Sequence, residues 1–463
     1  MMPRLVVAPK LRASIFDNRP IHAALGLAYL LAYWNVYITY VSVRWSYAGF
    51  AYRPLSLWEL SFAAVGVTAV AFFLPTRLRS PSALFVWLLF SFVYVPTMAQ
   101  TFMLGERVSG AYVLALVALT AVMILACLAC GRRSPSLGRL RVSSGTEVIP
   151  RAELAYGFLL VAAVMSVLLL FYYRSILAFA DITNSDDIYS ARFAAADMTG
   201  VLIGYIRLYY GYVFGPAVLA FGLISQRYRW FIAPGLACFV VSYMIDGSKI
   251  SLVTPLAIFA IYAVVRVARA SLLVMTGAMG AVTLVCSLLT GYSSLLRLFA
   301  DLILIRSIAI PGQQFVLYYD LFASRGYTWW SNVRGISLFV PPPAGFAADP
   351  RWPVLGQIVG EEYSGVASQN NSNASLFAGE GVAAAGPLGV LVIGVLLVVY
   401  LRILDRSSAD WHRIFVLMVM VPVALALTNI HLSTMLLSSG GAFWVALFIF
   451  LRRFGVMVPA RPR

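Results

Sequence analysis

The stretch AELAYGFLLVAAVMSVLLLFY at residues 152–172 decides the fold, because Glu153 is its only charged residue. A helix needs about 20 mostly apolar residues to cross the hydrocarbon core of a bilayer. Similar stretches recur along the chain. We therefore predict an all-α polytopic membrane protein of about twelve spanning helices, near residues 21–43, 57–76, 84–104, 111–130, 152–172, 199–224, 230–246, 250–268, 271–290, 385–402, 412–430 and 436–451.

Composition supports the same class of protein. Of the 463 residues, 61% are hydrophobic and 11% are charged, whereas soluble domains carry about 25% charged residues. The net charge of +16 is better explained by arginine-rich cytoplasmic loops than by nucleic-acid binding. Cys127 and Cys130 form a CxxC without a second Cys or His pair nearby, so they predict neither a metal site nor a disulfide.

The distribution of basic residues predicts the orientation. Most of the 34 Lys and Arg residues fall in the two terminal segments and in alternate connections between spans, which the positive-inside rule assigns to the cytoplasm. Both termini are then cytoplasmic, which requires an even number of spans. In a bacterium the protein would lie in the inner membrane, with the loop 173–198 facing the periplasm.

One wide polar gap interrupts the spans, and it divides the chain into three parts. Residues 1–290 are expected to form helices 1 to 9, residues 291–384 a large periplasmic loop, and residues 385–463 helices 10 to 12. The gap opens with a segment in which Arg297 and Asp301, four residues apart, are expected to pair on one helix face. It ends in a run of carboxylates and amides that suits hydroxyl-rich ligands: Glu361, Glu362, Asn370, Asn373 and Glu380.

A charged residue inside a predicted span is a candidate for function. Arg207 lies within the span 199–224, on a helix face that also carries Gly200, Gly204, Gly211 and Gly215. Small residues at this spacing favour close helix packing. A groove in which the arginine binds an anion is the alternative, and the sequence leaves both open.

Other polar side chains gather at the outward ends of spans. Asp246 and Lys249 either pair with each other or place the lysine beside the same anion as Arg207. His431 is either structural or part of a polar patch. Because arginine binds two phosphate oxygens at once, the outward cations indicate an anionic, amphipathic substrate; the candidates to bind it are Arg192, Arg207, Lys249, Arg297 and Arg306.

The layout resembles the O-antigen polymerase family, the Wzy-type oligosaccharide repeat-unit polymerases. The resemblance rests on the number of spans, the large loop before the last three, and an Asn-rich loop end that runs into Gly386 and Gly389. The related O-antigen ligases carry a His-Asn pair where this chain has Ser372-Asn373, which favours a polymerase. The resemblance to the polymerases implies a GT-C-like glycosyltransferase architecture.

The resemblance also implies a reaction. The enzyme would polymerise undecaprenyl-diphosphate-linked repeat units at the periplasmic face, in O-antigen or surface polysaccharide biosynthesis, with no cofactor and no metal. Glu380, Glu361 or Glu362 would be the base, the cations would hold diphosphates, and Asn370 and Asn373 would orient sugars. His431 has no counterpart in the resemblance and is a further substrate-binding candidate. Its partners would be the polyprenyl-diphosphate-linked oligosaccharide, membrane lipids and a chain-length regulator, but no nucleic acid.

Two alternatives remain at this point. An O-antigen ligase or another lipid-linked glycan transferase would use a different acceptor. A transporter or flippase of lipid-linked sugars would place its charges near the middle of the bilayer and contain broken helices. The outward position of the charged residues weighs against the transporter.

Overall fold

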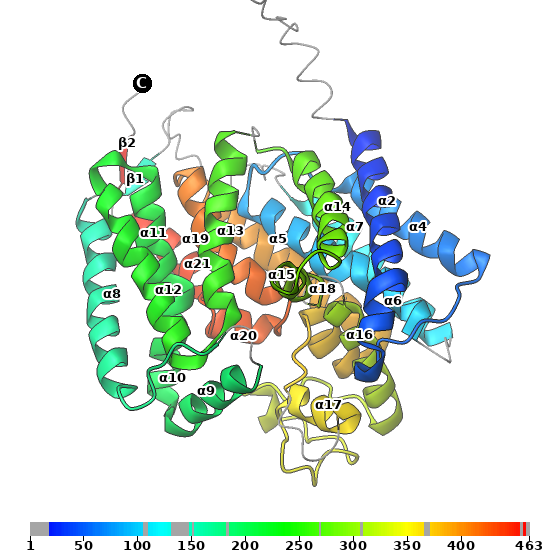
Figure 1. The fold of residues 1–463 in the computed structure, drawn as a ribbon. Helices are drawn as coiled ribbons and strands as arrows, with labels where there is room; N and C mark the ends of the chain where they lie inside the picture. The colour runs from blue at the N-terminus through cyan, green and yellow to red at the C-terminus, as the bar shows by residue number, and fades with distance from the viewer. Residues whose placement is uncertain are drawn as a thin grey trace, which may run out of the picture.

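The computed structural model describes residues 18–104, 110–130, 148–150, 152–181, 185–267, 270–305, 309–364, 371–453 and 457–459. The regular structure of these residues is mainly helical (Figure 1). The described residues also contain one isolated bridge and an antiparallel ribbon of two short strands, β1 (Val148–Pro150) and β2 (Met457–Pro459), besides turns and loops. The ribbon marks what we term the upper end of the bundle in Figure 1. The predicted all-helical class is confirmed.

The first third of the described chain forms four long rods. Two of them contain a π-helical turn: α2 continues through η1 into α3, and α5 continues through η3 into α6. Pro81 begins α5, where its missing N–H is not needed. The elements are α2 (Arg19–Val36), η1 (Tyr37–Val41), α3 (Ser42–Arg44), η2 (Ser46–Ala48), α4 (Leu57–Phe73), α5 (Pro81–Leu89), η3 (Phe90–Tyr94), α6 (Val95–Leu104) and α7 (Gly110–Ala129).

The middle third adds five more long helices and one short surface helix, α9, at the lower end (Figure 1). The rod α10–η4–α11 has a π-helical turn at its centre, directly after the segment that carries Arg207. The elements are α8 (Ala152–Tyr172), α9 (Ser185–Met198), α10 (Val201–Tyr209), η4 (Tyr210–Phe214), α11 (Gly215–Ile224), η5 (Gln226–Phe231), α12 (Ile232–Asp246), α13 (Lys249–Arg266) and α14 (Leu272–Leu289).

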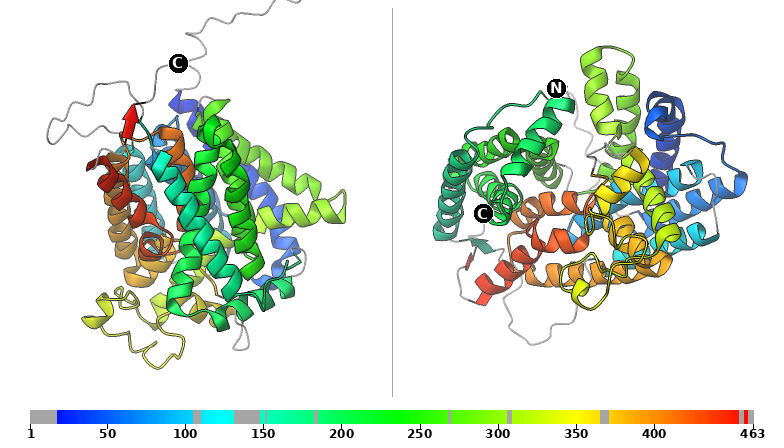
Figure 2. Two further views of the ribbon diagram at one scale, coloured as in Figure 1. Left: turned by 90° about the vertical axis from the view of Figure 1, so that its left-hand side faces the viewer. Right: turned by 90° about the horizontal axis from the view of Figure 1, so that it is seen from below.

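The last third contains shorter and broken helices. Figure 2 shows that α14 and α15 project together from the side of the bundle. The elements are α15 (Ser294–Leu304), α16 (Ile310–Arg325), η7 (Ile336–Leu338), α17 (Leu355–Ser364), η8 (Phe377–Val382), α18 (Ala383–Ser407), α19 (Arg413–Leu427), α20 (Leu432–Leu437) and α21 (Gly441–Arg453).

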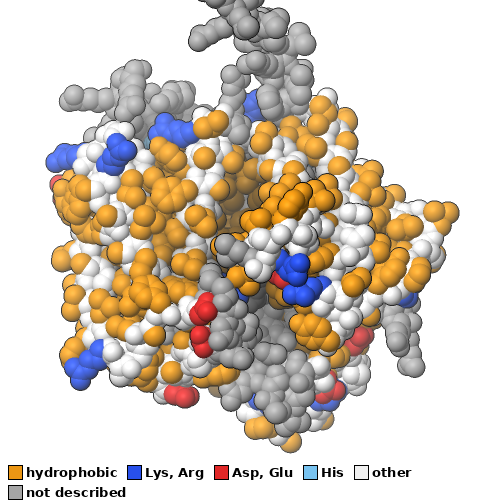
Figure 3. Space-filling view, viewed as in Figure 1, with side chains coloured by type: hydrophobic (Ala, Val, Ile, Leu, Met, Phe, Trp, Pro, Cys, Tyr) orange, Lys and Arg blue, Asp and Glu red, His pale blue; other side chains and the backbone are white. Residues whose placement is uncertain are grey.

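The described helices include nine that are long and apolar enough to cross a membrane, and three shorter apolar ones. The nine correspond to nine of the twelve predicted spans, and the shorter helices Leu57–Phe73, Arg413–Leu427 and Gly441–Leu451 correspond to the rest. A multi-pass membrane protein therefore agrees with the structure, whereas the count of twelve stays a prediction. Hydrophobic side chains cover most of the face in Figure 3, as a lipid-facing surface requires.

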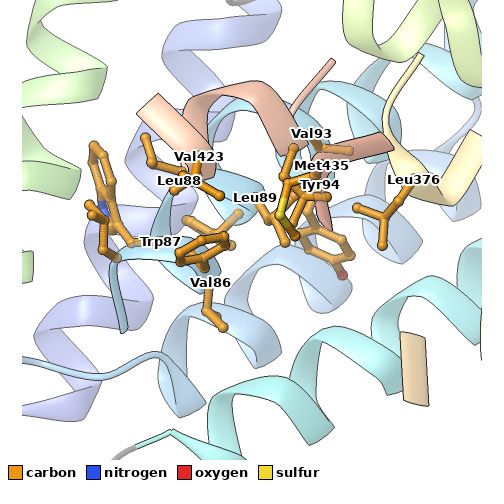
Figure 4. Packing of buried hydrophobic residues seen from close by; sticks show 14 of the residues in the cluster. Val86, Trp87, Leu88, Leu89, Val93, Tyr94, Leu376, Val423 and Met435 are labelled. Atoms are coloured by element: carbon orange, nitrogen blue, oxygen red, sulfur yellow. The ribbon is translucent and has the colours of Figure 1, made fainter. Parts of the chain in front are cut away.

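The core lies where α5, η3 and α6 cross α19 and α20. In the rod Pro81–Leu104, 94% of the most apolar window is buried, against 22% in α8. Figure 4 shows Trp87, Leu88 and Tyr94 of this rod close to Val423 of α19 and Met435 of α20. The central rod is therefore surrounded by protein, whereas α8 lies at the periphery. Both segments are apolar enough to span a membrane, so hydropathy alone does not separate them.

The predicted loop 291–384 is partly inside the bundle. α16 packs against α6, α18 and η8, and most of its residues from Gly312 to Phe322 are buried. Its polar residues Gln313 and Gln314 are both buried. The described part of the gap that lies below the bundle is the region around α17 (Figure 1). Part of the segment that was expected to form a loop is therefore buried among helices.

A sharp break separates η8 from α18. Ala385 and Gly386 have non-helical backbone angles, and Gly386 has a positive φ of 58°. A side chain at Gly386 would also meet the hydroxyl of Tyr327 at 2.8 Å, so both backbone and space require glycine. After the break the chain doubles back, and Gly381 of η8 lies beside Val390 of α18. This helical hairpin holds Glu380.

Candidate functional site

Arg207 forms an ion pair near the lower end of the bundle. Its Nη1 lies 3.6 Å from Oδ2 of Asp246, the last residue of α12, and the two side chains are 24% and 23% exposed. The backbone N–H of Ser248 donates to the same carboxylate at 2.8 Å. The pair joins α10 to α12, and Asp246 therefore has Arg207 as its partner.

Two further predicted cations lie close to this pair. The charge of Arg192, on α9, acts on the Asp246 carboxylate together with that of Arg207. Lys249 is the first residue of α13, directly after the turn that follows Asp246. The turn is held against α9, since a side chain at Gly247 would contact Ile188 at 3.5 Å. The structure thus brings three of the predicted cations into one region, which we call the Arg207 cluster: Arg192, Arg207, Asp246 and Lys249.

The glycine face around Arg207 is closely packed in one half and open in the other. Side chains at Gly211 and Gly215 would contact α12, the latter at 2.9 Å from Cβ of Cys238, so this half is close packing. A side chain at Gly200 would meet nothing within 4 Å, and at Gly204 only Thr199 of its own turn. The half below Arg207 is therefore open.

Glu380 is almost completely buried, with 2% of its surface exposed. Its carboxylate accepts hydrogen bonds from the backbone N–H of Leu432 at 2.7 Å and of Ser433 at 3.2 Å. The hydroxyl of Ser433 also donates to it. The carboxylate thus caps the first turn of α20, where it satisfies N–H groups that lack partners within the helix. This arrangement favours a positioning role over that of an exposed base.

His431 lies beside Glu380, in the turn between α19 and α20. Its imidazole packs directly on Gly379, where any side chain would overlap the ring. Burial lowers the pKa of His431, and the Glu380 carboxylate opposes that effect. The side chain is only partly shielded from solvent, in contrast to Glu380. The group that we call the Glu380 cluster is Gly379, Glu380, His431 and Ser433.

α20 connects the two clusters. The Glu380 cluster holds its N-terminus, and the hydroxyl of Tyr209, two residues after Arg207, donates to the carbonyl of Leu437 at its C-terminus, 3.0 Å away. α20 therefore carries the Glu380 cluster at one end and contacts, at the other end, the helix to which Arg207 belongs.

Glu361 and Glu362 are both on α17, below the bundle. Glu361 pairs with Arg351, and Glu362 pairs with Arg325, the last residue of α16. Both carboxylates are therefore neutralised by arginines from the same region. They hold the lower segment together, and their predicted role as bases stays a prediction.

The remaining predicted residues are less closely tied to either cluster. Nε of Arg297 donates to the carbonyl of Thr290 at 2.8 Å. The predicted pair of Arg297 with Asp301 is wrong, because Asp301 turns to α3 and pairs with Arg44 at 3.6 Å. Asn373 lies beside the start of α17. Two predicted residues, Arg306 and Asn370, lie outside the described residues.

The structure joins Tyr112 and Asp320, which were not among the predicted site residues, by a hydrogen bond between α7 and α16. The ring of Tyr112 also lies 4.0 Å from that of Tyr319, between centroids. A carboxylate four residues after Val316 in a mostly buried helix was the available signal. It was overlooked because the segment was expected to be a loop.

Within the described residues, no group of three or more His, Cys, Asp or Glu side chains is arranged to hold a metal ion. An apolar groove of about 510 Å³ runs between α2 and α4 and is lined by residues such as Ala23, Ala69 and Phe72. Thr68 is the one polar residue in its lining, so it suits a lipid acyl chain better than a sugar or a phosphate and does not compete with the two clusters.

The chain was compared with protein-family models, with curated proteins and with solved structures, and no match was found in any of the three comparisons. The function must therefore be argued from the two clusters themselves.

Proposed function

We propose that the protein is a glycosyltransferase that polymerises polyprenyl-diphosphate-linked oligosaccharide repeat units at the outward face of the membrane. The observation that carries the proposal is that α20 joins the two regions. The Glu380 cluster holds its N-terminus, and Tyr209, from the same helix as Arg207, donates to Leu437 at its C-terminus. The lower end of the bundle would then be the periplasmic one.

This arrangement suits the chemistry of glycosyl transfer from a lipid diphosphate. As the bond between the sugar and the diphosphate breaks, negative charge develops on the leaving group, and preformed cations stabilise it. Arg207 and Arg192 are placed for that role. The acceptor hydroxyl loses a proton as it attacks, and a partly exposed imidazole is a suitable base. We assign this role to His431, with Glu380 holding it in place.

The test is a reconstitution of the purified full-length protein with a synthetic polyprenyl-diphosphate oligosaccharide, with and without EDTA. We expect a ladder of products spaced by one repeat unit under both conditions. Arg207→Ala is expected to abolish chain extension without loss of expression, and His431→Asn to reduce the rate at least about 100-fold. A ladder of normal intensity from Arg207→Ala would exclude the proposed leaving-group site.

One observation favours a second function, transport of the lipid-linked sugar. The hairpin of η8 and α18 is a broken helix inside the bundle, and broken helices are typical of transporters. The same reconstitution in vesicles separates the two. Movement of an intact labelled substrate across the bilayer, without a ladder, would replace the transferase by a transporter.

A further inference from the structure

The carboxylate of Asp246, at the end of α12, has an unusual set of contacts. It is the last residue of α12 and the ion-pair partner of Arg207, but the contact of 3.6 Å is long for a hydrogen-bonded pair. Arginine usually binds a carboxylate through two parallel hydrogen bonds. The guanidinium is therefore compensated in charge while its donors are not tightly engaged by this carboxylate.

The charged residues around Asp246 are mostly cations. Arg192 and Arg207 both act on Asp246, and Lys249 follows it by three residues. Asp181 acts on Tyr243, one helical turn before Asp246. Arg192, Lys249 and Asp181 also have interactions of their own. An incoming anion would thus meet several cations, and the carboxylate of Asp246 already lies among them.

Space for such an anion exists on the α10 face. The positions of Gly200 and Gly204 are open below Arg207, while Gly211 and Gly215 above it are packed against α12. The Tyr212 hydroxyl interacts electrostatically with both Arg207 and Asp246, so it lies in the same region. The open half of the helix face and the ion pair therefore coincide.

We propose that the carboxylate of Asp246 occupies the anion-binding position of Arg207 in the empty protein and yields it to the diphosphate of the substrate. This inference rests on the proposed function. It adds that Asp246 regulates access of the donor substrate to Arg207. An unpaired guanidinium inside a membrane protein is costly, so Asp246 stabilises the empty state. A diphosphate offers more oxygens and more charge than one carboxylate, and it can displace it.

The test measures binding without turnover. Geranylgeranyl diphosphate is titrated into the purified full-length protein in detergent, and its dissociation constant is determined by calorimetry. Asp246→Asn is expected to bind at least about tenfold tighter than the wild type, because the competing charge is removed. Arg207→Gln is expected to bind at least about tenfold more weakly. The matched control is Arg174→Gln, an arginine after α8 that lies over the Phe171 ring and whose loss should leave binding unchanged.

Unchanged or weaker binding by Asp246→Asn would overturn the inference. If Asp246→Asn fails to fold, Asp246→Glu replaces it: the longer carboxylate should still compete, and tighter binding by that variant would also overturn the inference. Competition by the phospholipid phosphatidylglycerol at equal concentration would show that any headgroup phosphate is accepted, and would exclude a diphosphate-specific site. Binding in the expected order with no product ladder would leave this inference standing and remove the transferase proposal alone.

Discussion

Glu380 and Asp246 are both carboxylates in the lower half of the helix bundle, but the protein surrounds them differently. Glu380 is 2% exposed and receives hydrogen bonds from two backbone N–H groups and a hydroxyl. The Asp246 side chain is 23% exposed, accepts one backbone hydrogen bond from Ser248 at 2.8 Å, and faces Arg207 at 3.6 Å. Fixed donors surround the first carboxylate, whereas the second has one fixed donor and an arginine that another anion can bind.

The difference shows how to separate structure from function among buried charges. A carboxylate whose acceptors are filled by backbone donors contributes to the position of its neighbours, and has no lone pair directed at a substrate. A carboxylate that only balances a cation can exchange with a ligand. The two residues can therefore be told apart by stability measurements and by binding measurements.

The largest expected effect is on stability, and comes from Glu380→Gln. The neutral amide presents donors where the native carboxylate accepts three hydrogen bonds, so the start of α20 loses its partners. We expect a loss of about 2–4 kcal/mol in the free energy of unfolding, measured as a lower midpoint of thermal unfolding by tryptophan fluorescence. Asp246→Asn, the matched change at the other carboxylate, removes the charge partner of a part-buried arginine and should cost less, about 1–2 kcal/mol.

Equal destabilisation by the two variants would contradict the comparison, because it would make Asp246 as structural as Glu380. Ser433→Ala refines the result. It removes one donor and leaves both backbone donors in place, and is expected to cost about 1 kcal/mol. A larger loss from Ser433→Ala than from Glu380→Gln would show that the hydroxyl has a role apart from the carboxylate.

The sequence predicted the helices well because their signal is local. Twenty apolar residues such as 152–172 have one stable solution in a bilayer, whatever the rest of the chain does. The Arg207 cluster was also accessible, since an ionisable residue among glycines stands out within an apolar span. Arg192 and Lys249 could be associated with it because short connections place them at the same end.

The partners of those residues could not be predicted, because they depend on tertiary packing. Nothing local indicates that Glu380 reaches the N-terminus of α20, 52 residues later, or that Arg207 selects Asp246 over a solvated position. The sequence also did not predict the burial of α16. Its two glutamines are hydrophilic side chains, and their burial depends on the neighbouring helices that enclose them.

A smaller effect is expected from Gly379→Ala, which tests how tightly the Glu380 cluster is packed. A methyl group there would overlap the His431 ring, so the imidazole or the helix must move. We expect a cost of about 1–3 kcal/mol in stability and, under the proposed function, a loss of rate. The matched control is Gly157→Ala on α8, where a side chain meets nothing within 4 Å.

Gly157→Ala should leave stability unchanged or raise it slightly, because alanine favours helix more than glycine by about 1 kcal/mol. Comparable unfolding midpoints for the two glycine variants would mean that His431 is free to rotate away, and that Glu380 does not fix its orientation.

The smallest effect is expected in the lower segment, where carboxylates are paired but exposed. In the Arg325–Glu362 pair the side chains are 40% and 39% exposed, and in the Arg351–Glu361 pair 28% and 17%. Exposed ion pairs contribute about 0–1 kcal/mol and are weakened by salt. Arg325→Gln, Glu362→Gln and the double variant, compared at low and high salt, should therefore give a coupling energy below about 0.5 kcal/mol, and the same cycle at Arg351 and Glu361 a larger one. A coupling energy between Arg325 and Glu362 as large as the loss of stability from Glu380→Gln would contradict the comparison. The exposed carboxylate of Glu362 would then be held as firmly as the buried carboxylate of Glu380, and exposure would not separate structural from exchangeable carboxylates.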